Sequence, residues 1–350
     1  MRHNRRTFLK GFGAASAGLV VPLLAACSTS SAPAAPTPAA VAPAANTSVT
    51  KVSYAYASPN GFHFVATVAG EKPELVHPFG IEFDLLTTTN SPNAVNALVG
   101  GSVNIAAATP DSTWPALDKA PDVKQLWVIA NGTPYVLLAQ PEIKKAAELK
   151  GKTIGVSALV GGADTTAIKI LTSENGLGPT DYTLVQAGAI SDRTAAMQAK
   201  SIDACANLEP QASLLRDAGF PEIDNANNYP SLKGVHSIVL FSKTSFYQGQ
   251  PDLAANVLRA WDAVTKWIYD PANKAEVLAI SKKTMGGTDA GVEAVYQLHV
   301  VSQSLPKSLR ITEQYMQQFV DNLRKAGTEN LPSDPMKYVD SSLVQKVHNA

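Results

Sequence analysis

Small polar residues and glycines follow the predicted strands of this sequence, and their types suit hydrogen bonding to a small molecule. In α/β sheets, ligand-binding groups lie on the loops after the carboxyl ends of the strands. The candidate ligand-binding residues chosen on this ground are Asn60, Gly61, Phe62, Thr109, Pro110, Asp111, Asn131, Gly132, Ser157, Gly161, Gly162, Ala163, Asp164, Gly188, Asn207 and Glu209. Amides, hydroxyls and one aromatic ring predict reversible binding rather than covalent chemistry.

Most of these candidates also have a purely structural interpretation. Gly161 and Gly162 fit either ligand contact or a turn that needs positive φ. Asp164 fits either the ligand or the positive end of a helix dipole, and Asp111 fits a helix cap. The residues interpreted as structural first, and as cleft residues second, are Trp114, His63 and His236.

The charges of these loops bear on the ligand. They include Asp111, Asp164, Asp192 and Glu209 against a single base, Arg193, which the apolar pattern of its helix predicts to be exposed. A carboxylate in the pocket would repel an anion, although helix N-termini and backbone N–H groups can hold one. The pattern therefore favours a neutral or cationic, flat organic ligand.

Motifs of known catalytic sites are missing from the sequence. It contains no HExxH, GxSxG, phosphate-binding GxxxxGK[ST] or CxxC motif, and Gly155–Leu159 departs from a nucleophile elbow at its last position. No His, Cys and acidic cluster has metal-ligand spacing, so neither a metal nor a cofactor is expected. Of the two cysteines, Cys205 lies in an apolar run and is predicted to be a buried, inert thiol. The sequence therefore favours a binding protein over an enzyme.

Hydrophobic periodicity predicts two α/β lobes followed by helices. The first lobe is predicted to contain strands at 52–57, 81–86, 103–108 and 125–130, a helix at 61–75 and a helix that begins at Ser91-Pro92 and stops at Gly100. The second has strands at 153–157, 182–186 and 202–206 and helices at 163–174 and 192–199. Helices at 253–269, 274–284, 290–302 and 313–326 follow.

Charge and length limit the functional class. The 29 basic and 29 acidic residues of the 350-residue chain cancel, but residues 1–26 hold four of the basic ones. The rest of the chain, with 25 basic and 29 acidic residues, is mildly acidic, which argues against a nucleic-acid binder. The length predicts about two domains.

The N-terminal residues have the order of an export signal. Arg5-Arg6, followed by Phe-Leu-Lys, resembles a twin-arginine (Tat) signal, and the apolar residues 11–26 are too few to span a bilayer. Leu24–Ala26 before Cys27 resembles a lipobox, which predicts a signal peptide at 1–26 and lipidation of Cys27. The Ser/Ala/Pro-rich segment 27–50 reads as a tether. We expect a protein that is lipid-anchored at the outer face of the cytoplasmic membrane or in the periplasm.

Three segments together resemble one family. They are residues 96–108 (NALVGGSVNIAAA), residues 148–157 (ELKGKTIGVS) and residues 193–210, which end in Asn-Leu-Glu-Pro. Their order and spacing are similar to those of substrate-binding lipoproteins of ABC importers, in the group that takes nitrate, sulfonates, taurine, aromatic acids or thiamin-pyrimidine precursors. Asn104 stands where that family usually has aspartate.

The resemblance implies a type II periplasmic-binding fold that closes on its ligand by a hinge motion. It implies lobe 1 at 51–138 and 237–350, lobe 2 at 139–236, and crossovers near 137–140 and 236–241. The implied partners are a small-molecule ligand and an ABC permease and ATPase, and we expect the protein to be a monomer. The charges of the site loops place a pyrimidine-like or aromatic ligand ahead of a sulfonate, taurine or nitrate. A ligand-sensing receptor lipoprotein is an alternative. An enzyme on the same fold is a weaker one, because the cysteine-rich motif of the fungal pyrimidine synthases is missing.

Overall fold

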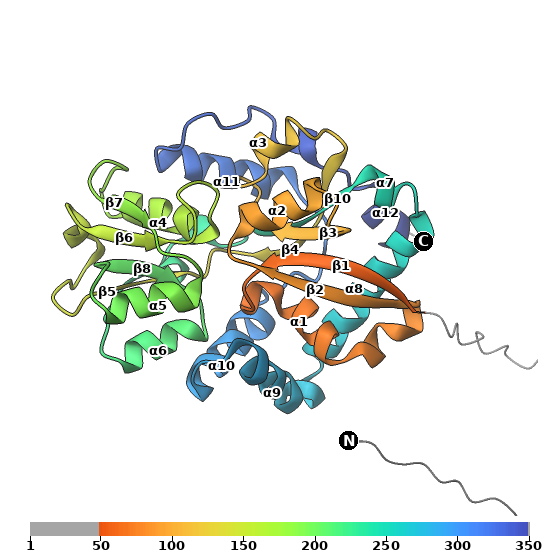
Figure 1. Cartoon of the computed structure of the whole chain (residues 1–350), viewed down its shortest axis with the longest axis horizontal. Helices are drawn as coiled ribbons and strands as arrows, with labels where there is room; N and C mark the ends of the chain where they lie inside the picture. The colour runs from red at the N-terminus through yellow and green to blue at the C-terminus, as the bar shows by residue number, and fades with distance from the viewer. Residues whose placement is uncertain (1–48, 349–350) are drawn as a thin grey trace, which may run out of the picture. The chain divides into compact units, whose positions relative to one another are not determined.

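The computed structural model describes residues 49–348, which form two lobes, each built on a five-stranded sheet (Figure 1). This arrangement confirms the predicted two-lobed α/β architecture. The predicted signal peptide, the lipidation site Cys27 and nearly all of the predicted tether lie outside the described residues. Within them, no helix has both the length and the hydropathy that a membrane span needs.

Lobe 1 combines the first part of the described chain with its last part. Its strands are β1 (Thr50–Ala57), β2 (Ile81–Thr88), β3 (Ile105–Ala108), β4 (Val123–Asn131) and β10 (His236–Lys243). Its helices are α1 (Phe64–Glu71), α2 (Ser91–Val99), α3 (Trp114–Leu117), α7 (Thr244–Tyr247), α8 (Pro251–Tyr269), α9 (Lys274–Met285), α10 (Asp289–Tyr296), α11 (Glu313–Lys325) and α12 (Ser342–His348). The strand order is β2-β1-β3-β10-β4, in which β10 runs antiparallel to both neighbours.

Lobe 2 is one continuous segment. Its strands are β5 (Val136–Ala139), β6 (Thr153–Val156), β7 (Thr183–Gln186), β8 (Ala204–Asn207) and β9 (Glu222–Asn225), and its helices are α4 (Ala163–Glu174), α5 (Ile190–Gln198) and α6 (Gln211–Asp217). The strand order is β7-β6-β8-β5-β9, and β5 runs antiparallel to both neighbours. The two sheets therefore share one arrangement of strand directions, although the antiparallel strand comes last along the chain in lobe 1 and first in lobe 2.

The chain crosses between the sheets at residues 132–135 and again at residues 226–235. The first crossover differs from the expected 137–140, because β5 occupies Val136–Ala139 and pairs with β8 and β9. The second ends where β10 begins at His236, instead of lying at 236–241. An extended apolar run looks the same in sequence whether it connects two lobes or pairs inside one, since its partners are remote.

Two of the predicted helices are interrupted. The expected helix 61–75 contains a short 3-10 turn and α1, which ends at Glu71 because the residue before Pro73 disfavours helical geometry. The expected helix 290–302 changes from α10 to a π-helical turn at Gln297–Val301. At the start of α2 the N-cap is Asn90 rather than Ser91, and its Oδ1 accepts a 3.0 Å hydrogen bond from the Asn93 amide.

Helices cover both faces of each sheet, so successive strand residues enter different cores. In β1, Tyr54 joins the core formed with α1 and α8, whereas Ala55 faces the core formed with α2 and α11. This split follows from the period of two along a strand. The first of these cores continues into lobe 2 through Phe62 and Tyr135, which places the cleft between the lobes over a shared apolar base.

Candidate functional site

A cavity lies between the lobes, at the carboxyl ends of their strands. Its lobe 1 wall is formed by the loop after β1, including Ser58, Asn60 and Phe62. Its lobe 2 wall includes Ser157, which follows β6, and the start of α4. Tyr135 of the first crossover also lines it. Strand ends and helix starts from both lobes therefore converge on one space, as the sheet topology predicts.

Some of the predicted site residues meet in this cleft and others do not. Those lining it are Asn60, Phe62, Ser157, Ala163 and Asp164. Thr109 lines a smaller inner chamber, which shares Phe62, Tyr135 and Ala163 with the cleft. Asn131 and Gly132 line a different cavity behind the crossovers. The remaining candidates, which line neither the cleft nor the inner chamber, are Gly61, Pro110, Asp111, Gly161, Gly162, Gly188, Asn207 and Glu209.

The floor of the cleft in lobe 2 is a buried ion pair. Nη1 of Arg193 lies 3.3 Å from Oδ2 of Asp164, and the side chains are 2% and 3% exposed. Asp164 also accepts hydrogen bonds from the Ser157 amide at 2.7 Å and from the Ser157 hydroxyl at 2.6 Å. The prediction that Arg193 is exposed is therefore wrong. The guanidinium folds back over α5, where Nη1 donates to the Gly188 carbonyl at 2.8 Å.

The other carboxylates of the site loops also have partners. Oδ2 of Asp111 accepts a 2.6 Å hydrogen bond from Thr166 of lobe 2, and burial raises the pKa of this carboxyl group. Glu209 pairs with Arg216, and Asp192 accepts from the Ala189 amide at its own helix start. No bare carboxylate lines the cleft within residues 49–348. The argument that carboxylates repel an anion from this pocket therefore loses its basis, because Arg193 compensates Asp164.

Aromatic rings form the opposite wall. The rings of Phe62 and Tyr135 are 5.9 Å apart, and the His63 ring packs 4.8 Å from that of Tyr56. Burial lowers the pKa of His63 to about 3, so its imidazole is neutral at physiological pH. Burial likewise raises the pKa of Tyr135, which keeps its hydroxyl protonated. The cleft therefore offers neutral hydrogen-bonding groups beside flat rings and one compensated ion pair.

The inner chamber adds a hydroxyl group without a partner. Thr109 and Thr133 both line it, and Oγ1 of Thr133 has no hydrogen-bond partner among the described residues. A buried polar group left unpaired costs about 1–3 kcal/mol, so such groups mark positions where water or a ligand completes the bonding.

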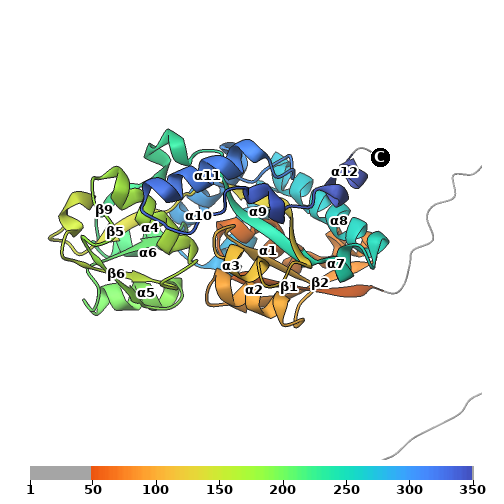
Figure 2. The ribbon, with the colours of Figure 1, turned by 90° about the horizontal axis from the view of Figure 1, so that it is seen from above.

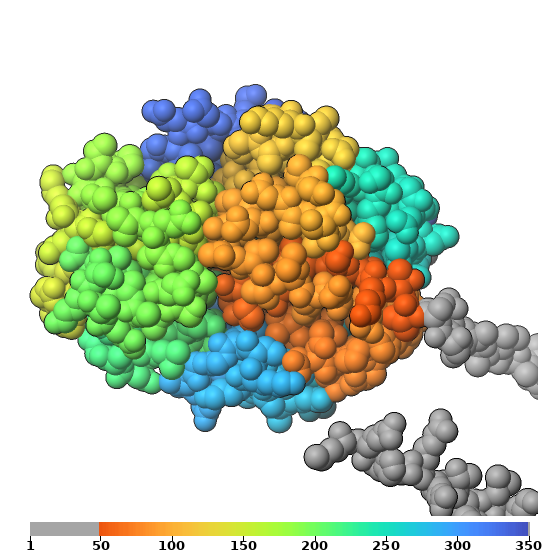
Figure 3. Space-filling view, viewed as in Figure 1, coloured from red at the N-terminus to blue at the C-terminus, as the bar shows by residue number. Residues whose placement is uncertain are grey.

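The lobes touch directly across the cleft, so the structure represents a closed form. The Asn90 side-chain amide donates to the Ser157 carbonyl at 3.2 Å, and Thr166 donates to Asp111. Gly161 packs on Ser112 so closely that an added Cβ would lie 2.8 Å from its Cα. In Figure 3 the green surface of lobe 2 abuts the orange surface of lobe 1. Gly161 has a φ of 71°, which also supports its predicted turn role.

The closed cleft is small. Its volume is about 30 Å³ and that of the inner chamber about 10 Å³. One water needs roughly 10–15 Å³ of such volume, whereas ligand pockets commonly enclose roughly 300–1,000 Å³. A small organic molecule therefore requires the lobes to move apart by a hinge motion before it enters.

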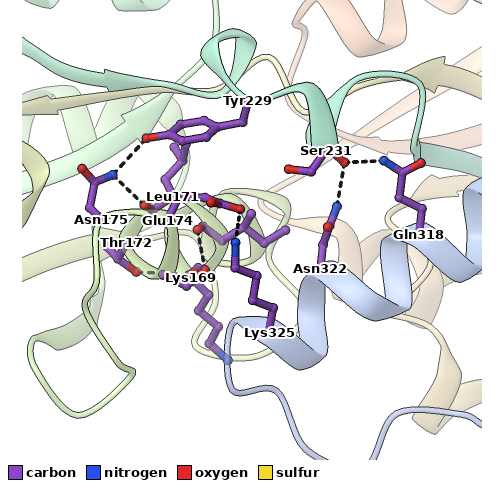
Figure 4. A network of polar contacts seen from close by, with 12 residues as sticks. Lys169, Leu171, Thr172, Glu174, Asn175, Tyr229, Ser231, Gln318, Asn322 and Lys325 are labelled. Atoms are coloured by element: carbon purple, nitrogen blue, oxygen red, sulfur yellow. Dashed lines mark hydrogen bonds and ion pairs between the residues drawn. The ribbon is translucent and has the colours of Figure 1, made fainter.

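On the hinge side, α11 of lobe 1 reaches α4 of lobe 2 (Figure 2). Lys325 forms a 2.7 Å ion pair with Glu174, and the side chains of Gln318 and Asn322 both donate to the Ser231 carbonyl of the second crossover (Figure 4). This network holds the second crossover against α11 and joins α11 to α4 of lobe 2.

Several cleft residues have weak sequence signals. Tyr135 sits in a run predicted only as a crossover, and Asn90 precedes the residue expected to cap α2. Ser58, with a φ of 53°, adopts a left-handed conformation that is rare for serine and frequent at functional sites. Trp114 packs on Phe319 in the core, and His236 bonds Asn131 and Thr312, so both keep their structural interpretation.

Comparison with known proteins identifies the family to which the chain belongs. The model of the family described as NMT1/THI5 like matches residues 78–275. The chain belongs to this NMT1/THI5-like family. The matched residues cover more than half of the chain and include all of lobe 2. No curated protein sequence matches it significantly.

Solved structures of low sequence identity share the fold. A protein of Bordetella bronchiseptica RB50 is 20% identical with a TM-score of 0.69, and the match covers 86% of this chain and 97% of the other. The alkanesulfonate-binding protein SsuA from Xanthomonas axonopodis pv. citri, bound to MOPS, is 16% identical with a TM-score of 0.69, covering 85% and 100%. These relatives confirm the expected type II periplasmic-binding fold.

An enzyme also shares this fold. The desulfurization enzyme DSZB is 16% identical with a TM-score of 0.61, covering 86% of this chain and 99% of the other. In this chain the one described cysteine, Cys205, is buried as predicted, and burial raises the pKa of its thiol to about 12. A thiol with so high a pKa is a poor nucleophile at neutral pH. Residues 49–348 contain no group of three potential metal ligands.

Proposed function

We propose that this protein is an extracytoplasmic solute-binding lipoprotein that captures a small organic molecule and delivers it to an ABC importer. The single observation that carries the proposal is the cleft itself. Groups from both lobes, among them Phe62, Ser157 and the Asp164–Arg193 pair, converge on one space that closes by direct lobe-to-lobe contacts. Capture by closure requires this arrangement, since a ligand that contacts both lobes stabilises the closed form over the open one.

The ligand that fits this cleft best is a flat, uncharged molecule, such as a pyrimidine-like or aromatic compound. Support comes from the rings of Phe62 and Tyr135, the neutral imidazole of His63 and the absence of net charge in the Asp164–Arg193 pair. Flat rings favour stacking, and neutral hydroxyls and amides favour hydrogen-bonding ligands without charge.

A sulfonate is the second candidate ligand. The structural relative from Xanthomonas is an alkanesulfonate-binding protein bound to MOPS. Arg193 keeps an Nε without a partner among the described residues, and a guanidinium is suited to bind a sulfonate. An anion would have to compete with Asp164 for this guanidinium, which is why the uncharged ligand ranks first.

The proposed location and partners rest on the N-terminal sequence. A Tat signal followed by a lipidated Cys27 would hold the protein at a membrane surface, and the segment 27–50 would act as its tether. A tether of this kind raises the effective concentration of the binding protein near an ABC permease and its ATPase. The cleft residues are proposed to bind the ligand reversibly, with no catalytic role.

A thermal-shift screen of the purified full chain tests the function. The panel contains pyrimidines, aromatic carboxylates, sulfonates, taurine, nitrate and amino acids. A ligand that binds only the folded protein raises Tm by mass action, by an amount that grows with concentration. We expect a shift with the uncharged ring compounds that is weaker in Phe62→Ala, with the exposed Leu86→Ala as the matched control. A shift by sulfonates alone would favour the second candidate, and turnover of the ligand would contradict a binding protein.

A further inference from the structure

A second and much larger cavity lies behind the two crossovers. Its volume is about 880 Å³, within the range of ligand pockets, whereas the closed cleft has about 30 Å³. Both crossovers line this rear cavity, the first through Gly132 and Pro134 and the second through Gly234. The third wall is formed by the end of α10, the π-helical turn after it and Tyr315 of α11.

The first crossover is the wall between the cleft and the rear cavity. Tyr135 lines the cleft, Pro134 lines the rear cavity, and Thr133 borders both the rear cavity and the inner chamber of the cleft. The two spaces therefore lie on opposite sides of the same backbone segment. The rear cavity is lined by the crossovers and by lobe 1, so a rotation of lobe 2 changes its shape through the backbone of the crossovers.

Glycines with positive φ occur in both crossovers at this cavity. Gly132 has a φ of 76° and Gly234 a φ of 79°, a conformation that glycine adopts without strain. An added Cβ at Gly234 would lie 3.0 Å from the Tyr315 ring, so the ring packs directly on the crossover. A molecule in the rear cavity would therefore contact the Tyr315 ring and the crossovers on which it packs, which are the segments whose backbone angles change during lobe motion.

The lining chemistry indicates an uncharged organic ligand. Amide and hydroxyl side chains on the wall include Asn227, Gln297, Ser302 and Gln303, and apolar surface comes from Leu232, Leu298 and Tyr315. Among the lining residues of the described chain, Lys233 is the single charged one, and it is exposed, as are the four amide and hydroxyl side chains just named. Neutral polar groups around apolar surface fit a molecule with hydroxyl or amide groups on a short carbon frame.

We propose that the rear cavity is a second binding site, for a small uncharged organic molecule, and that its occupancy favours the closed lobes. The structure shows the rear cavity in the closed form, so a ligand that fits it there better than in the open form shifts the lobe equilibrium toward closure. By linkage, it raises the affinity of the cleft for its own ligand by the same factor. This inference goes beyond the proposed function and does not depend on the identity of the cleft ligand.

Three probes of equal carbon length test the site: 1,6-hexanediol, adipate and 1,6-diaminohexane. Saturation-transfer NMR on the full chain should detect the diol in preference to either charged probe. Gln297→Trp and Ser302→Trp fill the cavity and should remove the diol signal, whereas Val301→Trp should retain it. Val301 is the matched control, because it is 58% exposed on the same turn and does not line the cavity. A diol signal retained in both cavity variants, or binding of a charged probe alone, overturns the assignment.

The effect on closure is measured as a distance between the lobes. The exposed Lys119 of lobe 1 and Lys145 of lobe 2 are replaced by cysteines that carry nitroxide labels. Cys27→Ser removes a competing labelling site, and the remaining native cysteine, Cys205, is buried and stays unlabelled. Adding the diol should enlarge the fraction of molecules at the shorter distance, without any cleft ligand, and this change should vanish in Ser302→Trp if the diol acts from the rear cavity. An unchanged or lengthened distance with bound diol contradicts the coupling. Failure of the ligand screen would leave this measurement intact, so the two proposals are tested separately.

Discussion

At the scale of single residues, the buried Asp164–Arg193 pair dominates the cleft. Each charge is removed from water, and each is compensated chiefly by the other and by Ser157 and Gly188. Breaking such a pair by removing one partner costs about 3–5 kcal/mol, because the other charge stays buried, whereas replacing both with neutral groups costs much less. The pair therefore ties the start of α4 to α5 strongly, whatever the ligand is.

Arg193→Met should lower the free energy of unfolding by about 3–5 kcal/mol, since it leaves the Asp164 carboxylate without a counter-charge. Adding Asp164→Asn to this variant should recover much of the loss. Urea unfolding measures both, and Arg324→Met is the matched control because Arg324 is exposed and pairs with Asp321 at the surface. A double variant no more stable than Arg193→Met would contradict the role of the ion pair.

The neutral His63 in the aromatic wall of the cleft predicts a pH dependence of stability. Burial lowers the pKa of His63 from 6.5 to about 3. Between these two pH values the unfolded chain binds a proton on His63 that the folded protein does not bind. Stability is therefore fully present above pH 6.5 and falls as the pH drops toward 3. Protonation of His63 in the unfolded chain lowers the free energy of unfolding by about 2 kcal/mol between pH 6.5 and pH 5.

Replacing His63 with phenylalanine should remove this loss. His63→Phe keeps a ring against Tyr56, and the Nδ1 atom it deletes has no partner among the described residues. The free energy of unfolding in urea is measured at pH 6.5 and at pH 5. The difference between the two values should be about 2 kcal/mol smaller in His63→Phe than in the unsubstituted protein. Phe64→Leu, which changes a buried aromatic residue next to His63 without removing a titratable group, should leave the difference unchanged. The same loss in His63→Phe as in the parent would disprove the assignment.

At the scale of elements, the hydrogen bonds from α11 to the second crossover should matter for stability. Asn322→Leu removes the 2.9 Å hydrogen bond to the Ser231 carbonyl at a site that is 9% exposed. We expect a loss of about 1–2 kcal/mol in the free energy of unfolding. Gln317→Leu is the control on the same helix, because its hydrogen bond to Asp321 is exposed. Equal effects of the two variants would mean that the crossover contact contributes nothing specific.

The elements also show how far the sequence could be interpreted. Strands β1, β2 and β6 and helices α4 and α8 were predictable because their residues alternate or repeat with helical spacing, which is local information. The assignment of β5 and β10 to lobes was not predictable in this way. Each is a short apolar run whose place depends on which remote strand it pairs with.

The same limit explains the candidate site. Asn60, Phe62, Ser157 and Asp164 were within reach because each follows a strand whose end is clear in the sequence. Asn131 follows a strand just as clearly, yet it lines the rear cavity, since the path of the crossover decides which side it faces. The burial of Arg193 depends on Asp164, a residue on another helix, and local periodicity carries no information on that pairing.

At the scale of the whole described chain, contacts across the cleft set the balance between open and closed lobes. Thr166→Val removes the 2.6 Å hydrogen bond that links α4 of lobe 2 to Asp111 of lobe 1. The loss of a donor to a shielded carboxyl group disfavours closure by about 1–3 kcal/mol. The lobe-to-lobe distance between labels at 119 and 145 should therefore lengthen.

The neighbouring threonine provides the control for this experiment. Thr165 donates to the Ala158 carbonyl within lobe 2, so Thr165→Val alters the fold of the lobe rather than the contact between lobes. We expect it to lower the melting temperature without lengthening the distance. A distance distribution in Thr166→Val that matches the parent would show that Asp111 does not hold the lobes together.

Lobe 2 is a continuous insertion, since β5 to β9 lie between β4 and β10 of lobe 1, and the described chain both starts and finishes in lobe 1. A molecule held by its two ends in optical tweezers therefore carries the applied force through lobe 1 alone. Lobe 2 feels no tension until β4 or β10 tears away from the first sheet. Its rupture should follow that of lobe 1 as a separate step, so the more deeply inserted half of the protein is mechanically shielded by the half that surrounds it in the sequence.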